Sequence, residues 1–447
     1  MPLTQTKNNM RQLTGKYCQD CKIFTDNVEE DAVALVQTML EHPAFAESHI
    51  RIMPDVHMGK GITIGFSAPL GKFVNPNHGG VDIGCTVSTM ELSTVVPSER
   101  YAEFERLIGE VIPTGHRIYD REVIDRKDFF EFLDREYQQV MHDFPETIYP
   151  VEQIDEAFVS RFLLRIGMNE EMFYRSLPSL GGGNHFLEYG ETEDSRGFFT
   201  AHCGSRNLGV KVCNYWARKC SESSKDIADE DRRRIAKEVK ESCPDQTKWG
   251  QLIVEATKRV REEEYMTDYL SGAYLKGYLS DMVITQAYAR YNHIMIHRLV
   301  SGILKEHFGI EVVDEIFTTH NYIDFKDHPM LRKGAIRAYA DELCIIPFNM
   351  RDGLAICRGK SNPDWNYTAP HGAGRILSRS AAKMKLKMEE FQKTMSEVYS
   401  TTVCEGTLDE SPMAYKPMDE IVRLIEPTVE ILYFVRPKIN IKATDEE

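Results

Sequence analysis

The fold and the site follow from five segments: Val81-Asp82-Ile83-Gly84-Cys85, Gly181-Gly182-Gly183-Asn184-His185, His202-Cys203-Gly204-Ser205-Arg206, His320-Asn321-Tyr322 and His371-Gly372-Ala373-Gly374-Arg375. Each places a potential metal ligand or nucleophile beside glycine or asparagine. Glycine lets the backbone turn sharply or approach a ligand closely. The segments are far apart in the chain, so a site built from all of them requires one shared core.

The first hundred residues predict a mixture of helices and short strands. Asp26 is a candidate cap for a helix whose apolar positions share one face and which ends near Pro43. The stretch 50–92 is rich in glycine and β-branched residues, which is typical of strands and tight turns. Ser98 is a candidate cap for a second helix that runs through Val111.

The later sequence continues this mixture. Residues 214–308 form the most helical region, and the charged part, 225–261, predicts a solvated helical elaboration. Strands are expected near 311–317 and 343–357, a helix after Ser378, and a last helix and strand at the end. We therefore expect an α+β protein: one large mixed α/β fold over residues 1–447, with a central β-sheet core surrounded by helices.

Composition and charge narrow the class. A chain of 447 residues suggests two or three domains by length alone, but the sequence shows no repeat and no linker. Hydrophobic residues make up 42%, which is sufficient for a sizeable core. The formal net charge of −15 excludes a protein that coats nucleic acid by bulk attraction. An RNA substrate would need a local basic groove or bound metal ions.

The sequence also predicts a cytoplasmic protein without a membrane partner. Its first residues are polar, and no stretch approaches the roughly 18 apolar residues of a membrane span. The ten cysteines lack the dense spacing of a disulfide scaffold. Cys18 and Cys21 form a lone C-x-x-C without a second ligand pair nearby, so we interpret them as incidental thiols.

Asp82 and Cys85 lie three residues apart in a glycine loop. A carboxylate beside a thiolate suits a borderline divalent ion better than Mg²⁺ or Ca²⁺, which prefer oxygen ligands. His185, His202 and His320 supply imidazoles in similar turns. A single histidine of this kind is more often a packed or surface residue. Three of them, together with an Asp and a Cys, favour a metal site.

The histidine of the last segment has different surroundings. The glycines around His371 allow close approach to phosphorus, a neutral imidazole can act as a nucleophile, and Arg375 can neutralise phosphate. The alternative is a glycine turn that precedes a helix. Residues 55–61 could orient metal ligands, contact phosphate through Lys60, or form a plain polar turn. No P-loop or dinucleotide fingerprint is present.

Taken together, the motifs resemble the RtcB family of RNA-splicing ligases between about Pro54 and Lys442. They are P-D-V-H-x-G-K-G, V-D-I-G-C, G-G-G-N-H-F-x-E, H-x-G-S-R, H-N-Y, R-K-G-A-x-R-A and H-G-A-G-R, in family order. The resemblance implies a GTP- and Mn²⁺-dependent ligase that joins RNA 3′-phosphate or 2′,3′-cyclic phosphate ends to 5′-hydroxyl ends.

The resemblance also implies roles for individual residues. Two manganese ions would be held by Asp82, Cys85, His185, His202 and His320, with Cys85 bridging. His371 would carry GMP covalently. The implied nucleotide contacts are Asn184, His185, Phe186, Leu187, Glu188, His320, Asn321, Pro347, Phe348, Asn349, Met350, His371, Gly372, Ala373, Gly374, Arg375, Tyr415 and Lys442.

One segment departs from the family pattern. After Pro347 the family has G-S-M-G-T-A-S, whereas this chain has F-N-M-R-D-G-L, with Leu354 in place of a nucleotide-contacting serine. The departure indicates a divergent branch and favours RNA repair over obligatory tRNA splicing. The alternative function is a metal-dependent RNA-end phosphatase or cyclic phosphodiesterase that does not ligate. The intact H-G-A-G-R segment argues against it, because hydrolysis needs no guanylylated histidine.

Overall fold

The computed structural model describes residues 10–262 and 267–444. Its largest sheet has seven strands, and neighbouring strands pair antiparallel. The strand order is β12 (Leu343–Asn349), β13 (Gly353–Gly359), β15 (Val429–Ile441), β6 (Phe186–Glu191), β7 (Gly197–Cys203), β5 (Thr86–Leu92) and β8 (Val312–Thr319). The sheet curls so that its two edge strands approach each other: the Ile345 backbone N–H of β12 donates to Thr318 Oγ1 of β8 over 3.1 Å.

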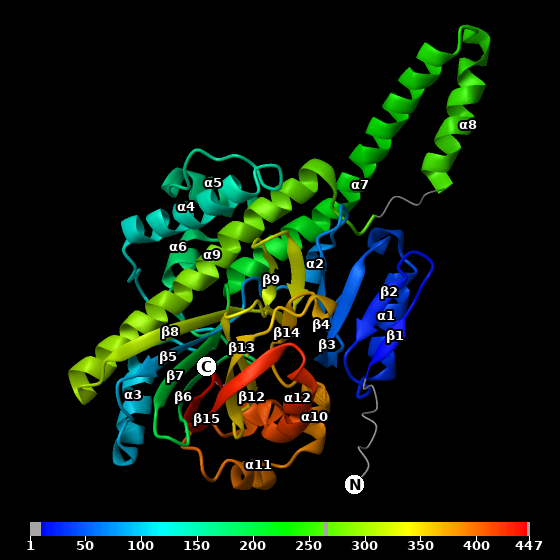
Figure 1. The fold of residues 1–447 in the computed structure, drawn as a ribbon. Helices are drawn as coiled ribbons and strands as arrows, with labels where there is room; N and C mark the ends of the chain where they lie inside the picture. The colour runs from blue at the N-terminus through cyan, green and yellow to red at the C-terminus, as the bar shows by residue number, and fades with distance from the viewer. Residues whose placement is uncertain (1–9, 263–266, 445–447) are drawn as a thin grey trace, which may run out of the picture.

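A second sheet lies beside the first (Figure 1). Its strands, in order, are β1 (Arg11–Leu13), β2 (Asp20–Ile23), β3 (His49–His57), β4 (Ile64–Pro69), β10 (Met330–Lys333) and β9 (Asn321–Asp324), and only β2 and β3 pair parallel. A two-stranded sheet pairs β11 (Ala335–Arg337) with β14 (Thr368–Pro370). Strands β3 and β14 each lead into a segment that the sequence singled out.

The central helix is α9 (Gly272–Ile303). It is apolar around most of its circumference, which is the pattern of a helix buried on all sides. Ile296 and Val300 pack with Leu187 and Phe199 of the large sheet. On its other side, α9 packs against α4 (Arg126–Asp143), so it lies between the sheet and the helical layer (Figure 1).

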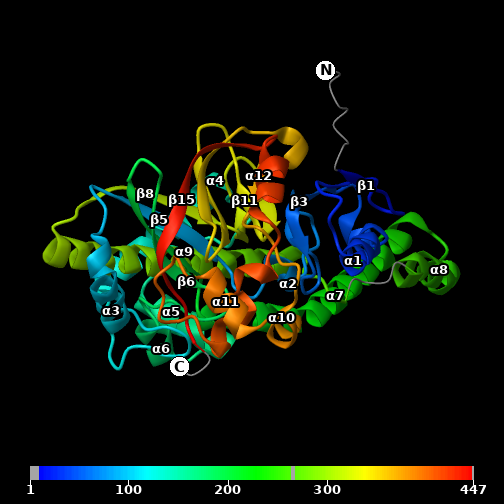
Figure 2. The same cartoon turned by 90° about the horizontal axis from the view of Figure 1, so that it is seen from below.

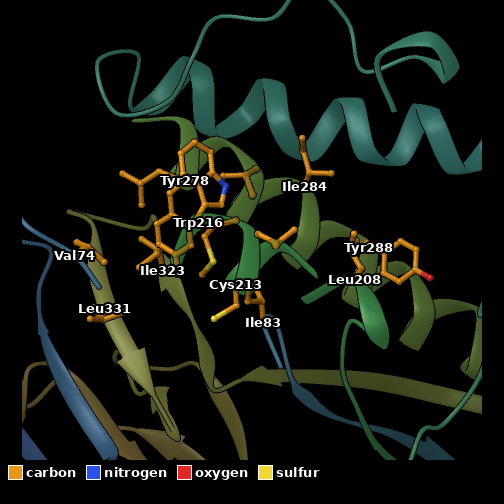
Figure 3. Close-up of a cluster of buried hydrophobic side chains, with 14 of the residues drawn as sticks. Val74, Ile83, Leu208, Cys213, Trp216, Tyr278, Ile284, Tyr288, Ile323 and Leu331 are labelled. Carbon is orange, nitrogen blue, oxygen red and sulfur yellow. The ribbon is translucent and has the colours of Figure 1, made fainter. Parts of the chain in front are cut away.

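Figure 3 shows the core where α7 (Asn207–Ser242) meets α9: Trp216 and Tyr278 lie together, with Val74, Ile323 and Leu331 nearby. The outer part of α7 and α8 (Trp249–Glu262) form a hairpin that extends away from the body (Figures 1 and 2). The remaining helices are α1 (Glu30–Leu40), α2 (Pro76–Gly79), α3 (Tyr101–Val111), α5 (Glu156–Ile166), α6 (Glu170–Arg175), α10 (Arg379–Lys385), α11 (Met388–Thr394) and α12 (Met418–Ile425).

The predicted α+β class, with a central sheet, surrounding helices and a charged helical elaboration, is confirmed. Two helix starts were predicted wrongly. The first helix begins at Glu30, after Glu29, so Asp26 does not cap it. A 3₁₀ turn over Ser98–Arg100 precedes α3, and the Ser98 side chain makes no cap. Local polar residues are frequent in turns as well as at caps, which is why the two were confused.

Three further expectations can be compared with the structure. Ser378 caps α10 by accepting from the Ala381 backbone N–H over 3.2 Å, as its position before that helix suggested. Cys18 and Cys21 are buried free thiols. Within the described ranges, no helix combines the length and the apolar character needed to cross a membrane.

An ion pair between a partly exposed arginine and a buried aspartate joins α9 to the helical layer. Arg165 of α5 donates to both carboxylate oxygens of Asp281, over 3.0 and 2.7 Å, and Trp216 Nε1 donates to Oδ2 over 2.6 Å. Removing the Asp281 carboxylate leaves the buried indole N–H of Trp216 without a partner, whereas the partly exposed Arg165 guanidinium can still be hydrated. We expect Asp281→Ala to lower the free energy of unfolding by about 1–3 kcal/mol in urea titrations. Asp281→Asn, which keeps an oxygen for Trp216, should lose less, and equal losses would contradict this account.

Candidate active site

Strand register brings the predicted metal ligands to one edge of the large sheet. Thr86, the first residue of β5, pairs with Cys203 on β7 and with Thr319 on β8. Phe186, the first residue of β6, pairs with His202 on β7. The residues just outside these strand ends are Cys85, His185 and His320. All three therefore gather around His202.

The side chains converge closely. Cys85 Sγ lies 3.2 Å from His202 Nε2 and 3.5 Å from His185 Nε2. Asp82 Oδ2 lies 2.9 Å from His185 Nε2. The ring of His320 is centred 5.1 Å from that of His202. The structure thus brings all five predicted ligands together.

Three of these residues offer ligand atoms to a single point. The ligand atoms of Cys85, His185 and His202 all lie within 4.8 Å of one another. His320 Nδ1 is buried and has no hydrogen-bond partner in the part of the chain that the structure describes. Buried polar atoms normally have partners, so an orphan at this place fits a ligand to a metal ion. The donor set therefore fits a divalent metal.

Burial controls the protonation of the cluster. It lowers the pKa of His202 and of His320 well below the ordinary value, so both imidazoles are neutral and keep a lone pair for a metal. Burial, followed by the charge of Asp82, raises the pKa of the Cys85 thiol. For Asp82, burial acts to raise the pKa, but His185 and hydrogen bonds outweigh it and lower the pKa. A bound cation would reverse the effect on Cys85 by stabilising its thiolate.

The backbone around the cluster leaves room for it. His185 Nδ1 lies 3.0 Å from the Leu180 carbonyl oxygen, an arrangement that directs Nε2 toward Cys85 and Asp82. A Cβ atom at Gly204 would lie 2.0 Å from Asp82 Oδ1. Glycine at position 204 is therefore required for the position of the Asp82 carboxylate.

His371 begins the turn after β14, beside the metal cluster. Its Nδ1 lies 2.6 Å from Asp55 Oδ2, and its backbone N–H donates to the same oxygen over 3.1 Å. With Nδ1 engaged, Nε2 is the nitrogen left for chemistry. The His371 ring is centred 4.8 Å from that of His320.

The roles left open for residues 55–61 are now distinguishable. Asp55 is fully buried and orients His371 through the hydrogen bond from Nδ1. His57 lines the neighbouring cavity, while Lys60 is exposed. The segment is more than a plain polar turn.

A cavity of about 250 Å³ opens between His371, His202 and the C-terminal segment. The predicted nucleotide contacts that line it are Asn184, Phe186, Glu188, Pro347, Phe348, Asn349, Met350, His371, Gly372, Ala373, Gly374, Arg375, Tyr415 and Lys442. Residues from five separate segments of the chain thus line one cavity.

Other predicted residues lie elsewhere. Leu187 belongs to the hydrophobic core beneath β6, because successive strand residues face opposite sides of the sheet. Asn321 Oδ1 accepts from the Gly334 backbone N–H over 2.8 Å, so it braces the turn before β11. Leu354 packs inside the curl of the large sheet, away from the cavity. The Leu354 side chain therefore cannot make the nucleotide contact that the family pattern assigns to a serine at this position.

Sequence reasoning missed Glu410, a buried carboxylate on the cavity wall. Its oxygens accept from Tyr415 Oη over 2.6 Å, Arg375 Nη1 over 3.1 Å and Lys442 Nζ over 3.3 Å. Burial acts to raise the Glu410 pKa, but the charges of Lys442, Arg379 and Arg375 outweigh it and lower the pKa. Gly353 and Arg379, which also line the cavity, were missed as well. The sequence near position 410 carries no motif that indicates this role.

The Glu410 network changes the interpretation of Arg375. Besides Glu410, its guanidinium donates to the Leu377 and Asp409 carbonyl oxygens over 3.0 and 2.6 Å. Most of its donors are engaged within the protein. Arg375 therefore braces the turn after His371, and the bidentate phosphate contact expected from sequence would require these bonds to break.

The segment that departs from the family pattern is internally paired. Asn349 Oδ1 accepts from the backbone N–H groups of Arg351 and Asp352 over 3.0 and 2.9 Å. The Arg351 guanidinium donates twice to the Asp352 carboxylate, over 2.8 Å each. The two new charges therefore neutralise each other and add little net charge to the cavity.

These features define a class of protein: one with a buried cluster of side chains that fits a divalent metal, beside a histidine oriented by a buried carboxylate. The family model described as "tRNA-splicing ligase RtcB" matches residues 36–443. The chain therefore belongs to the RtcB family.

Individual members of the family are similar in sequence to this chain over most of their lengths. The RNA-splicing ligase RtcB of Escherichia coli K12 is 27% identical, covering 94% of this chain and 97% of the relative. The tRNA-splicing ligase RtcB of Archaeoglobus fulgidus is 25% identical, covering 89% and 88%. The RNA-splicing ligase RtcB of Mycobacterium bovis is 23% identical, covering 83% and 90%. The similarity extends well beyond the motifs.

The close approach of Gly204 to Asp82 gives a first test of the metal cluster. Gly204→Ala should push the Asp82 carboxylate away and weaken Mn²⁺ binding by about 10–100-fold, as lost support of a metal ligand does. Isothermal titration calorimetry measures this directly. Gly109→Ala is the matched control, because a Cβ atom there meets no atom within 4 Å. Equal Mn²⁺ affinity in both variants would contradict the role assigned to Gly204.

The burial of Glu188 on the cavity wall can be tested through the pH dependence of the protein's stability. Burial raises its pKa from 4.5 to about 8, although Asn440 Nδ2 donates to Oε2 over 2.8 Å. Between these values the folded chain retains a proton that the unfolded chain releases, so stability falls as pH rises. Relative to Glu188→Gln, the parent should lose up to about 1.4 kcal/mol per pH unit between about pH 5 and 8. Urea unfolding of both proteins across this range is the measurement, and a pH-independent difference would contradict it.

Proposed function

We propose that this protein is an RNA ligase that joins 3′-phosphate or 2′,3′-cyclic phosphate RNA ends to 5′-hydroxyl ends. GTP is the co-substrate, and a covalent His371–GMP intermediate links its two half-reactions. The observation that carries the proposal is the contact between His371 Nδ1 and Asp55, at the wall of a cavity that adjoins the metal cluster. A purely hydrolytic metal enzyme needs no such oriented nucleophile.

The first step forms a bond between His371 Nε2 and the α-phosphorus of GTP. The bond from that phosphorus to the bridging oxygen breaks, and pyrophosphate leaves with the electron pair. The proton on Nδ1 stays in its hydrogen bond to Asp55. That proton keeps Nε2 as the lone-pair nitrogen, which is the form that can attack.

The cavity offers partners suited to guanine. Glu188 presents a carboxyl group with acceptor oxygens, and Lys442 presents an ammonium held by Glu410 and by the carbonyl oxygens of Asn184 and His185. Guanine has a ring N–H and a carbonyl oxygen, whereas adenine has neither. Tyr415 supplies an aromatic ring in the same cavity. We therefore propose selection of GTP over ATP.

The cluster of Asp82, Cys85, His185, His202 and His320 would hold two Mn²⁺ ions. A mixed oxygen, sulfur and nitrogen set suits such an ion better than Mg²⁺. When bound, the metal supplies positive charge that offsets the negative charge of the phosphates.

The second half-reaction transfers GMP from His371 to the RNA 3′-phosphate, after water has opened any cyclic phosphate. The 5′-hydroxyl oxygen then attacks the activated phosphate, and GMP leaves. Residues 1–447 would form one ligase unit that acts in RNA repair or tRNA processing. Ten free cysteines fit the reducing conditions of a cytoplasmic location.

Incubation with GTP and Mn²⁺, followed by intact-mass measurement, tests the proposal. A gain of one GMP that disappears when 3′-phosphate RNA is added supports the ligase. Processing of RNA 3′ ends with no adduct and no joined product would instead support the phosphatase or cyclic phosphodiesterase.

The role of His371 can be separated from that of the metal cluster. We expect His371→Ala to abolish both the GMP adduct and ligation of 3′-phosphate RNA, because the only proposed nucleophile is lost. RNA that already carries a 3′-guanylyl group should still be sealed, since that step uses the metal centre alone. An adduct on the variant would mean that another residue is the nucleophile. Failure to seal activated RNA at full metal loading would show a further role for His371.

A further inference from the structure

A buried lysine holds the backbone next to Asp55, the partner of His371. Lys416 follows Tyr415 and is only 3% exposed. Its Nζ donates to the backbone carbonyl oxygens of Pro54 over 2.8 Å, Val56 over 3.2 Å and Asn27 over 2.9 Å. Pro54 and Val56 are the two neighbours of Asp55. The ammonium therefore holds the backbone on both sides of the carboxylate that orients His371.

The same residue also holds the His371 turn. The Lys416 backbone N–H donates to the Gly374 carbonyl oxygen over 2.9 Å. Gly374 lies so close to β3 that a Cβ atom there would be 2.2 Å from the Asp55 carbonyl oxygen. Lys416 thus contacts both backbone segments whose side chains form the Asp55–His371 hydrogen bond.

Charge gives Lys416 a second effect. Asp55 is fully buried, and its Oδ1 has no hydrogen-bond partner among residues 10–262 and 267–444. A buried carboxylate stays ionised only where positive charge compensates it. The three N–H groups of Lys416 are satisfied by neutral carbonyl oxygens, so its charge remains available to Asp55. Burial lowers the Lys416 pKa, and Asp55 is the carboxylate that opposes this most strongly.

We propose that Lys416 is a positioning residue for guanylylation of His371, an inference that rests on the proposed function. Its ammonium holds Asp55 in place as a hydrogen-bond acceptor, which keeps the proton of His371 on Nδ1 and the lone pair on Nε2. With a neutral residue at position 416, the buried Asp55 carboxylate would lack this compensating charge and would no longer hold the imidazole proton on Nδ1. A proton on Nε2 would block formation of the bond to phosphorus.

The two half-reactions separate this role from general support of the fold. In Lys416→Met, the single-turnover rate of GMP adduct formation with GTP and Mn²⁺ should fall by about 10–100-fold, the usual cost of losing a partner that orients a reacting group. Sealing of RNA that already carries a 3′-guanylyl group should stay within about threefold of the parent. An unchanged adduct rate, or equal losses in both reactions, would overturn the proposal.

Lys333 provides a matched control. It is also buried, and its Nζ donates to carbonyl oxygens of Lys60 over 2.7 Å and Asn77 over 2.9 Å. These carbonyls do not flank Asp55. Both Lys333→Met and Lys416→Met should lower the melting temperature. Lys333→Met should nevertheless keep the adduct rate within about threefold of the parent. An equal loss of adduct formation in Lys333→Met would overturn a specific role for Lys416.

A double-mutant cycle tests whether Lys416 acts through Asp55. In an Asp55→Asn background, Lys416→Met should slow adduct formation by less than about threefold further, because the charge it supports is already gone. The full loss in that background would overturn the proposal. If Lys416→Met does not fold, Lys416→Gln retains a donor for the carbonyls without the charge, and a parental adduct rate in it would overturn the role of charge. A parent protein that forms no GMP adduct would instead refute the proposed function itself.

Discussion

The register of four antiparallel strands determines where the ligand side chains meet. Thr86 is paired on one side with Cys203 and on the other with Thr319, and Phe186 is paired with His202. A slip of one residue would turn each strand's side chains to the opposite face. The buried residues of β5 and β7 make such a slip costly, because Val87, Phe198 and Phe199 would exchange environments. Hydrophobic packing thus holds the geometry of a polar centre.

Helix α9 connects the packed core to the loops that carry His185 and follow His202. Asn292, which is fully buried, accepts from the Ser179 backbone N–H over 2.9 Å and donates to the carbonyl oxygens of Ser179 and Gly204 over 3.0 and 3.3 Å. One side chain therefore links the loop that carries His185 to the turn after His202. Because most residues of α9 are buried, Asn292 has a fixed position. The packing of the core therefore determines where the loops around the candidate metal cluster lie.

The cavity is electrostatically distinct from the rest of the molecule. The chain carries a net charge of −15, yet Arg375, Arg379 and Lys442 all line the cavity. Glu410 pairs with each of them, which compensates the charge of the buried Lys442 and of the less buried Arg375 and Arg379. An anionic ligand that entered the cavity would meet cations already held in place. Such an arrangement would let an acidic protein accept a polyanionic ligand.

From the sequence alone, the class of fold, several strands and the five side chains that converge in the candidate metal cluster could be predicted, because each depends on local pattern: β-branched stretches, glycine turns and metal-binding residue types. Leu187 was predicted to contact the nucleotide but packs in the core, since which face a strand residue occupies depends on pairing with distant strands. Glu410 and Lys416 could not be recognised at all. Their roles arise from burial beside residues hundreds of positions away, which is a property of tertiary packing. The sequence by itself determined which chemical groups the chain carries, and the tertiary structure decided which of them are buried together, because desolvation and neighbouring charges exist only after the chain has folded.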